Sequence, residues 1–201
     1  MNKNMSAGGG SAFGGRIKIV DGFKIRNTYD IDFGMLADYF NTPYLKPGEI
    51  WLDKIYLPEK KRILSEYQES RRLMKKYGYE KAKKMLRFKK VKGFKIETAK
   101  LKLLKKQNKF KIYLVNGRKI RDNFDPNFFN GGHYLVYKYI PKNEIWVDSV
   151  ALTKERKYII IHELSELKLM QRGKDYNDAH DYANAAEKEA RRRDGAVYVT
   201  D

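Results

Sequence analysis

The last third of the chain shows two stretches with the periodicity of helices. Residues 158–170 are apolar around most of a helical circumference, which is typical of a buried helix. Residues 176–193 carry a stripe of alanines at helical spacing, which would let two helices approach closely. Gly173 suits the turn between them, because glycine accepts a positive φ without a Cβ clash. The pattern predicts an antiparallel helical hairpin.

Shorter apolar runs earlier in the chain predict strands. Arg16–Val20 and Lys111–Val115 each run into an Asp-Gly or Asn-Gly pair, which is a strong signal for a β-hairpin. Extended segments follow and end in Glu49–Asp53 and Glu144–Asp148. A helix is then expected to begin near residue 58 or 153. The prediction is an α+β fold, in which a short curled antiparallel sheet precedes a helical hairpin.

This plan occurs twice. When the chain is shifted by 95 residues, Asp21–Leu57 falls on Asn116–Leu152 without a gap, and 13 of the 37 positions are identical, including Trp51 and Trp146. We therefore predict two tandem copies of one small domain. The expected divisions are a flexible Gly/Ser tail at 1–15, a first copy at 16–88, a basic amphipathic connecting segment at 89–110 and a second copy at 111–201.

The helical hairpin of the second copy carries the candidate chemistry. His162 and Glu166 lie four residues apart, hence on one helical face. Glu166 lies seven residues before Gly173 and His180 seven after it, so an antiparallel hairpin brings them level. Glu187 lies within a turn of the position level with His162. Ionisable groups in an apolar helix are costly unless they are paired or bound to a metal.

Two imidazoles and a carboxylate are typical of a catalytic zinc site. The predicted ligands of zinc, or of another divalent metal, are His162, Glu166, His180 and Glu187. Glu163 is the candidate general base that activates a metal-bound water. A buried polar knot that joins two helices without metal is the alternative. His133 follows two glycines and is a candidate further ligand. No histidine lies in the first copy, which favours a functional over a structural cluster.

The spacing His-Glu-Leu-x-Glu-x-x-Leu-Met, followed by Gly-x-x-Tyr-x-x-Ala-His-x-x-Ala-x-x-x-Glu, resembles a signature of uncharacterised bacteriophage-encoded proteins. The resemblance covers roughly residues 116–193. It implies a phage or prophage origin and a zincin-like domain, and it implies no particular substrate. The usual zincin pattern places its second histidine four residues after the first, and in this chain Glu166 occupies that position while the other histidine comes from the next helix.

The formal net charge of +18 is concentrated in one segment. Residues 81–111 hold 14 basic side chains and one acidic side chain, Glu97. Ile96, Ala99 and Leu103 predict one apolar face of a basic helix, which could contact nucleic acid, a membrane surface or a partner, or form only a solvated surface. The candidate nucleic-acid-binding residues are Lys89, Lys90, Lys92, Lys95, Lys100, Lys102, Lys105 and Lys106.

Composition limits the remaining classes. The chain has no cysteine, which excludes disulfides and thiolate ligands, and we expect no membrane span. The expected location is the host cytoplasm or the virion. Two functions remain open: a metal-dependent, peptidase-like hydrolase, or a non-catalytic virion or DNA-associated protein whose cluster is a staple or a relic. Residues shared by both copies are expected to be structural, namely an ion pair of Arg26 with Asp53, a pair of Arg121 with Asp148, and Glu49 and Glu144.

Overall fold

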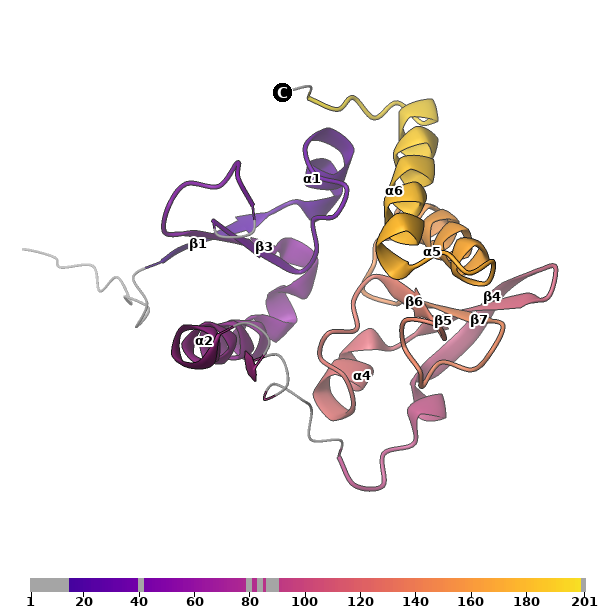
Figure 1. The fold of residues 1–201 in the computed structure, drawn as a ribbon, viewed down its shortest axis with the longest axis horizontal. Coiled ribbons are helices and arrows are strands. Elements are labelled where there is room, and N and C mark those ends of the chain that lie inside the picture. Colours follow the sequence, from indigo (N-terminus) through magenta and orange to yellow (C-terminus); the bar gives the residue numbers. More distant parts are fainter. Residues whose placement is uncertain (1–14, 40–41, 79–80, 83–84, 86–90, 200–201) are drawn as a thin grey trace, which may run out of the picture.

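The computed structural model describes residues 15–39, 42–78, 81–82, 85 and 91–199. Its described part has an α+β fold with one three-stranded and one four-stranded sheet. Figure 1 shows the two sheets in separate halves that lie side by side, the first in indigo to magenta and the second in pink to yellow. The predicted tail falls largely on residues 1–14, outside the described residues.

The first half contains a mixed sheet. Its strand order is β1-β3-β2, in which β1 pairs with β3 in parallel and β2 pairs with β3 antiparallel. The second helix expected for this half falls on residues of which most are not described. The elements are β1 (Arg16–Val20), α1 (Gly22–Thr28), β2 (Leu36–Asp38), β3 (Glu49–Asp53), the 3-10 helix η1 (Lys54–Glu59) and α2 (Lys60–Tyr77).

The second half repeats this arrangement and adds an edge strand. Its order is β4-β5-β7-β6, with β5 parallel to β7 and β6 antiparallel to β7. The elements are the 3-10 helix η2 (Ile96–Ala99), β4 (Lys100–Gln107), β5 (Phe110–Val115), α4 (Gly117–Asn123), β6 (Gly131–His133), β7 (Glu144–Asp148), α5 (Arg156–Met170) and α6 (Tyr176–Arg193).

The registers of the two sheets correspond. Arg16 pairs with Glu49 in the first sheet, and Lys111 pairs with Glu144 in the second. Every partner pair of β5–β7 and of β6–β7 lies 95 residues beyond a pair of the first sheet. The sheets therefore share strand order, strand direction and register over these three strands.

The expected hairpins at Asp-Gly and Asn-Gly were wrong, because these residues begin helices instead. The side chain of Asp21 accepts a hydrogen bond from Lys24 N, and that of Asn116 accepts one from Lys119 N, so both are N-caps. After each short helix the chain passes through an antiparallel strand, β2 or β6, before it reaches β3 or β7, which is parallel to the strand before the helix. The sheets are consequently mixed rather than antiparallel.

The glycine after each cap is required by close packing. A Cβ on Gly117 would collide with the carboxylate of Asp148, which accepts a hydrogen bond from Gly117 N at 3.1 Å. Gly22 has the same relation to Asp53, at 3.2 Å. Glycine therefore serves here to admit a buried carboxylate rather than to form a hairpin turn.

The predicted basic helix at 89–110 was also wrong. Residues 100–107 form β4, which pairs antiparallel with β5 through a turn in which Asn108 has a φ of 53°. Asparagine tolerates this left-handed conformation, so the two-residue turn closes a hairpin. Leu103, expected on the apolar face, is exposed, whereas Leu104 packs on the core. The segment is thus part of the second sheet and not a separate connection.

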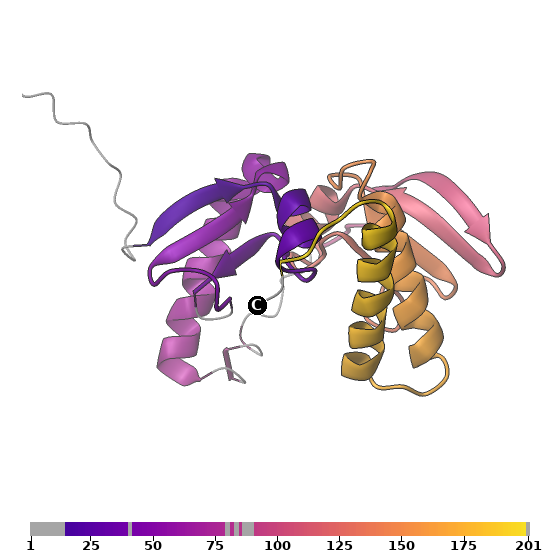
Figure 2. The same ribbon diagram turned by 90° about the horizontal axis from the view of Figure 1, so that it is seen from above.

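The helical hairpin at the C-terminus is confirmed. Helices α5 and α6 lie side by side and antiparallel, as Figure 2 shows in orange and yellow. Ala179 and Ala183 are fully buried between them, and Gly173 in the connecting turn has a φ of 90°. One core cluster packs α5 against β5 and β7 through Ile145, Val147 and Leu167 among others. This packing fixes the position of α5 on the sheet.

Buried arginines hold each half together, as expected. Arg26 lies 3.5 Å from Asp53, and Arg121 pairs with Asp148. The predicted structural role of Glu49 also agrees with the structure: Glu49 accepts hydrogen bonds from Arg16 and from the indole of Trp51. The arginine pairs join helices α1 and α4 to strands β3 and β7, and the contacts of Glu49 lie within the first sheet.

The same arginines also join the two halves. Arg26 of the first half donates to Glu155 of the second at 2.7 Å. Arg121 of the second half donates to Glu59 of the first at 2.6 and 2.8 Å. Glu59 and Glu155 are the residues that precede α2 and α5. The two halves therefore exchange equivalent ion pairs, and all four side chains are buried.

Candidate metal centre

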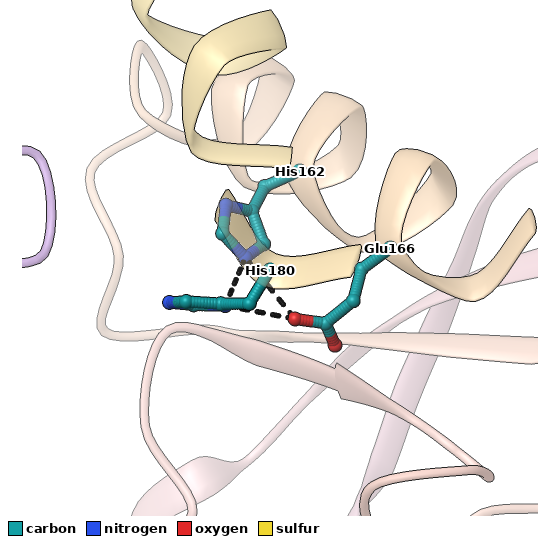
Figure 3. A group of neighbouring side chains, drawn as sticks. All are labelled: His162, Glu166 and His180. Carbon is teal, nitrogen blue, oxygen red and sulfur yellow. Dashed lines mark hydrogen bonds and ion pairs between the residues drawn. The ribbon is translucent and has the colours of Figure 1, made fainter. Parts of the chain in front are cut away.

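Three predicted ligands converge between α5 and α6, as Figure 3 shows. His162 and Glu166 project from α5 one turn apart, and the antiparallel α6 brings His180 level with them. His162 Nε2 lies 3.2 Å from His180 Nδ1 and 3.7 Å from Glu166 Oε2, and His180 Nδ1 lies 2.8 Å from Glu166 Oε2. The hairpin register inferred from Gly173 is therefore confirmed.

The spacing of the three atoms suits a metal ion. Ligand atoms that bind zinc at 2.0–2.1 Å in a tetrahedron lie about 3.3 Å from one another. The observed separations of 2.8, 3.2 and 3.7 Å scatter around that value. Histidine nitrogen and carboxylate oxygen are also ligands that zinc prefers. The three residues fit one divalent cation and leave room for a fourth ligand.

Each histidine is oriented by a carboxylate on its outer nitrogen. His162 Nδ1 donates to Glu187 Oε2 at 3.1 Å, and His180 Nε2 donates to Asp32 Oδ1 at 3.2 Å. Desolvation opposes ionisation of the buried Glu187 and of the more exposed Asp32, but hydrogen bonds to these histidines lower the pKa of both, so both carboxylates act as acceptors. A proton on each outer nitrogen leaves the inner nitrogen as a lone pair in the neutral ring.

Glu187 therefore does not join the predicted ligand set. It contacts the nitrogen of His162 that faces away from Glu166 and His180, and its other oxygen accepts from Arg191 at 2.7 and 2.9 Å. A carboxylate on the second nitrogen of a ligating histidine fixes the ring and raises its basicity. Glu187 is an orienting partner of His162.

His133 orients Glu166 in a similar way. Its Nδ1 accepts from Leu135 N at 3.3 Å, so its Nε2 carries the proton and donates to Glu166 Oε1 at 2.9 Å. His133 is fully buried on β6. Both of its nitrogens are thus in use, and it supports a ligand rather than serving as the predicted further ligand.

The pKa values of His162 and His180 reflect the negative charge of the carboxylates around them. Burial alone would lower the pKa of His162, but hydrogen bonds to Glu166 and Glu187 raise it to about 10. Hydrogen bonds to Asp32 and Glu166 raise the pKa of His180 to about 9. Although burial opposes it, hydrogen bonding to the histidines lowers the pKa of Glu166. The site formed by His162 Nε2, His180 Nδ1 and Glu166 Oε2 therefore favours a bound cation, which can be a proton or a metal ion.

Glu163 lies beside the cluster without belonging to the triad. Its carboxylate faces β6, where a Cβ on Gly131 would lie 3.2 Å from Glu163 Oε1. Burial raises the pKa of Glu163 to about 7. A carboxyl group with a pKa near neutrality can accept and return a proton under physiological conditions. The position and the pKa both suit the predicted general base.

A second set of atoms also lies close enough to hold an ion. Ligand atoms of His133, Glu163 and Glu166 lie within 4.8 Å of one another. However, binding through Nε2 of His133 would require its proton to move to Nδ1, which already accepts from Leu135 N. The tautomer of His133 thus favours a single cation at His162, Glu166 and His180.

The cluster opens into a pocket of about 220 Å³ between the two halves. Glu163, Glu166 and both histidines line it. The first half contributes Ile31 and Asp32 to its wall. The remaining wall is mixed: it has apolar and aromatic side chains, namely Phe129, Val136, Tyr137, Ile159 and Tyr176, and polar or charged ones, namely Arg26, Asn130, Glu155, Asn184, Glu187 and Arg191. A ligand can therefore reach the inner nitrogens from a cavity that both halves enclose.

The lysines predicted to bind nucleic acid differ in their exposure and in their contacts. Lys100 is half-buried and pairs with Glu144 at 2.7 Å, so it stabilises the sheet. The other described candidates, Lys92, Lys95, Lys102, Lys105 and Lys106, are exposed on or before the edge strand β4. Lys89 and Lys90 lie outside the described residues.

Sequence reasoning missed Asp32. It lies 148 residues before His180, on a loop between α1 and β2 of the half that lacks histidines. Asn184 donates to its second oxygen at 3.0 Å. No local pattern marks Asp32. The one available signal was its counterpart at the shift of 95 residues, Asn127, which lacks a charge.

Comparisons of the chain with protein-family models, with curated proteins and with solved structures gave no match. Among the described residues, no helix combines the length and the apolarity that crossing a membrane requires.

Proposed function

We propose that the protein is a metal-dependent hydrolase of zincin type, with peptides as the substrate class. The observation that carries the proposal is the convergence of His162 Nε2, His180 Nδ1 and Glu166 Oε2 at the spacing of a tetrahedral coordination sphere. A general base lies beside them. Zinc is the cation that these ligand types fit best.

In this proposal each residue has a separate task. His162, Glu166 and His180 would hold the metal ion, which would supply Lewis-acid polarisation of the scissile carbonyl group. Glu163 takes a proton from the attacking water and passes it to the leaving amine, which its pKa of about 7 allows. His133 and Glu187 hold the ligands in place. The cavity of about 220 Å³ admits a side chain or a short segment of substrate.

Zinc titration of the purified chain tests the proposal. Elemental analysis and calorimetry should give one equivalent of zinc, displaced by a chelator. Two equivalents would place a second ion at His133 and Glu163. Less than about a tenth of an equivalent after zinc addition would overturn the proposal and favour the polar knot, in which the protein is a non-catalytic phage component. Cleavage of a mixed peptide library then tests the substrate class.

Two substitutions on α5 separate binding from catalysis. Glu163→Gln should retain zinc and the fold and lose hydrolysis by about 100-fold or more, because an amide cannot take the proton. Glu166→Gln should lose most of the zinc, because it removes the anionic ligand. Zinc content and peptide turnover measure both. Loss of zinc from Glu163→Gln together with its retention in Glu166→Gln would contradict the assigned roles.

A second activity is supported by the exposed lysines. We propose that the edge strand β4 and the preceding segment contact the phosphates of nucleic acid, because Lys102, Lys105 and Lys106 are exposed on a strand that has no neighbour on its outer side among the described residues. Lysines on an edge strand also prevent pairing with other chains, which is the competing explanation.

Binding to duplex DNA distinguishes the two. Phosphate contacts predict an affinity that falls steeply between low and physiological salt, because counterions are released. Replacing Lys102, Lys105 and Lys106 by Gln should weaken binding and flatten this dependence. Replacing Lys100 is unsuitable, because it breaks the pair with Glu144. If the protein does not bind DNA at low salt, the proposed phosphate contact is wrong. The lysines would then serve only to prevent pairing of β4 with other chains.

We further propose that the two halves descend from one duplicated domain. The proposal is supported by the common register at 95 residues and by the exchanged ion pairs of Arg26 with Glu155 and Arg121 with Glu59. An experimental structure tests it by superposition of β1, β2 and β3 on β5, β6 and β7, in that order. Different strand directions in the two sheets would refute it.

A further inference from the structure

The half without histidines contacts the outer side of the metal centre. Asp32 lies between α1 and β2 and accepts from His180 Nε2 at 3.2 Å. Its second oxygen is held by Asn184 of α6 at 3.0 Å. Asp32 is therefore fixed between the ligand histidine and the helix that carries it.

The other histidine is linked to the first half through buried charges. Glu187 holds His162 and is itself held by Arg191, whose guanidinium also donates to Glu155 at 2.7 Å. Glu155 accepts from Arg26 of the first half. Arg191 additionally donates to Asn27 of the first half at 2.8 Å. A continuous chain of hydrogen bonds thus connects His162 to α1.

We propose that the first half supplies the outer shell of the metal centre and that Asp32 is its positioning residue. The inference rests on the proposed metal site. The carboxylate of Asp32 holds the proton of His180 on Nε2, which leaves Nδ1 free to bind the cation. The histidine-free half thereby completes a centre whose ligands all lie in the other half.

The geometry makes Asp32 suitable for a clean test. Its side chain is 55 % exposed, so its removal leaves no buried cavity. Asp181 provides a matched control, because it is an exposed carboxylate adjacent to His180 on α6. Asp181→Ala removes the same charge, and the hydrogen bond to the ring remains in place.

The experiment compares zinc affinity in the full-length chain. Competition with a chelator should show that Asp32→Ala weakens zinc binding by about 10- to 100-fold, the usual effect of losing a partner of a metal-bound histidine. Asp181→Ala should change it by less than about threefold. Asp32→Asn, which keeps an oxygen acceptor, should recover part of the loss.

Nitrogen-detected NMR of the zinc-loaded protein gives a readout that a merely structural role would not move. In the wild type the Nε2 proton of His180 should be slow to exchange, and in Asp32→Ala it should exchange rapidly. Equal losses of affinity in Asp32→Ala and Asp181→Ala, or no loss in either, would overturn the inference while the metal site stands. Failure of the wild type to bind zinc would instead overturn the proposed function, and the inference with it.

Discussion

At the scale of single residues, the site depends on which nitrogen of each histidine carries the proton. His162 Nδ1 donates a hydrogen bond to Glu187, and His180 Nε2 donates one to Asp32. The other nitrogen of each ring therefore faces Glu166. His133 has the opposite task, because its Nε2 proton is directed at Glu166. Three chemically identical side chains are thus distinguished by their acceptors alone.

The carboxylate of Glu49 makes a prediction about acid stability. Hydrogen bonds from Lys18 and Arg16 lower the pKa of Glu49 to about 2. Because this pKa is depressed, the stabilisation is complete above the pKa of the unfolded chain, near 4.5, and is lost as the pH falls toward 2. Urea unfolding of the wild type and of Glu49→Gln should differ at pH 6, and the difference should shrink as the pH falls below 4.5 until little of it remains at pH 2. A difference that persists at pH 2 would contradict the assigned pairing.

At the scale of elements, close approach of β6 to α5 brings His133 and Glu163 to the ligands. Gly131 permits it, since a Cβ there would lie 2.6 Å from Ile159 Cγ2 and 3.0 Å from Trp146 O. Its counterpart in the first half is Leu36, in a half without the cluster. The strand and helix of the second half can therefore be closer at this position.

Gly131→Ala should separate these two elements. We expect a loss of about 1–3 kcal/mol in the free energy of unfolding, as overpacking usually causes, and weaker zinc binding, because His133 moves away from Glu166. Gly34→Ala is the control, since its Cβ would meet only the ring of Phe129 at 3.2 Å or more. Chemical denaturation and zinc competition measure both effects. Equal behaviour of the two variants would contradict the role given to Gly131.

At the scale of the whole molecule, equivalent ion pairs join the halves but serve different ends. Glu59 binds Arg121, and it lies apart from the metal centre. Glu155 binds Arg26 and also Arg191, which holds Glu187. The pair of Arg121 with Glu59 is therefore structural only. The pair of Arg26 with Glu155 is also linked to His162 through Arg191 and Glu187.

Two matched substitutions test this difference. Glu59→Gln and Glu155→Gln should each lower the free energy of unfolding by about 1–3 kcal/mol, because each weakens charge-assisted hydrogen bonds in the interior. Only Glu155→Gln should also weaken zinc binding, because Arg191 loses its second anchor. Thermal unfolding and chelator competition provide the two measurements. Reduced zinc affinity in both variants would show that it follows overall stability instead.

The sequence by itself determined the features that depend on local periodicity. Helical spacing and Gly173 set the hairpin register, which placed His162, Glu166 and His180 together. The pairs of Arg26 with Asp53 and Arg121 with Asp148 were also predictable, because buried charges require partners. Short-range order of this kind is encoded within a few turns of one element.

Only the tertiary structure decided how distant segments pair. An apolar strand has the same side-chain pattern beside a parallel or an antiparallel neighbour, so the crossover of β1 to β3 was not visible in the sequence. Residues 100–107 became a strand because β5 offers backbone hydrogen bonds, which outweighed an apparent helical spacing. Asp32 meets His180 across 148 residues of chain, because docking of the two halves, rather than any local pattern, brings them together.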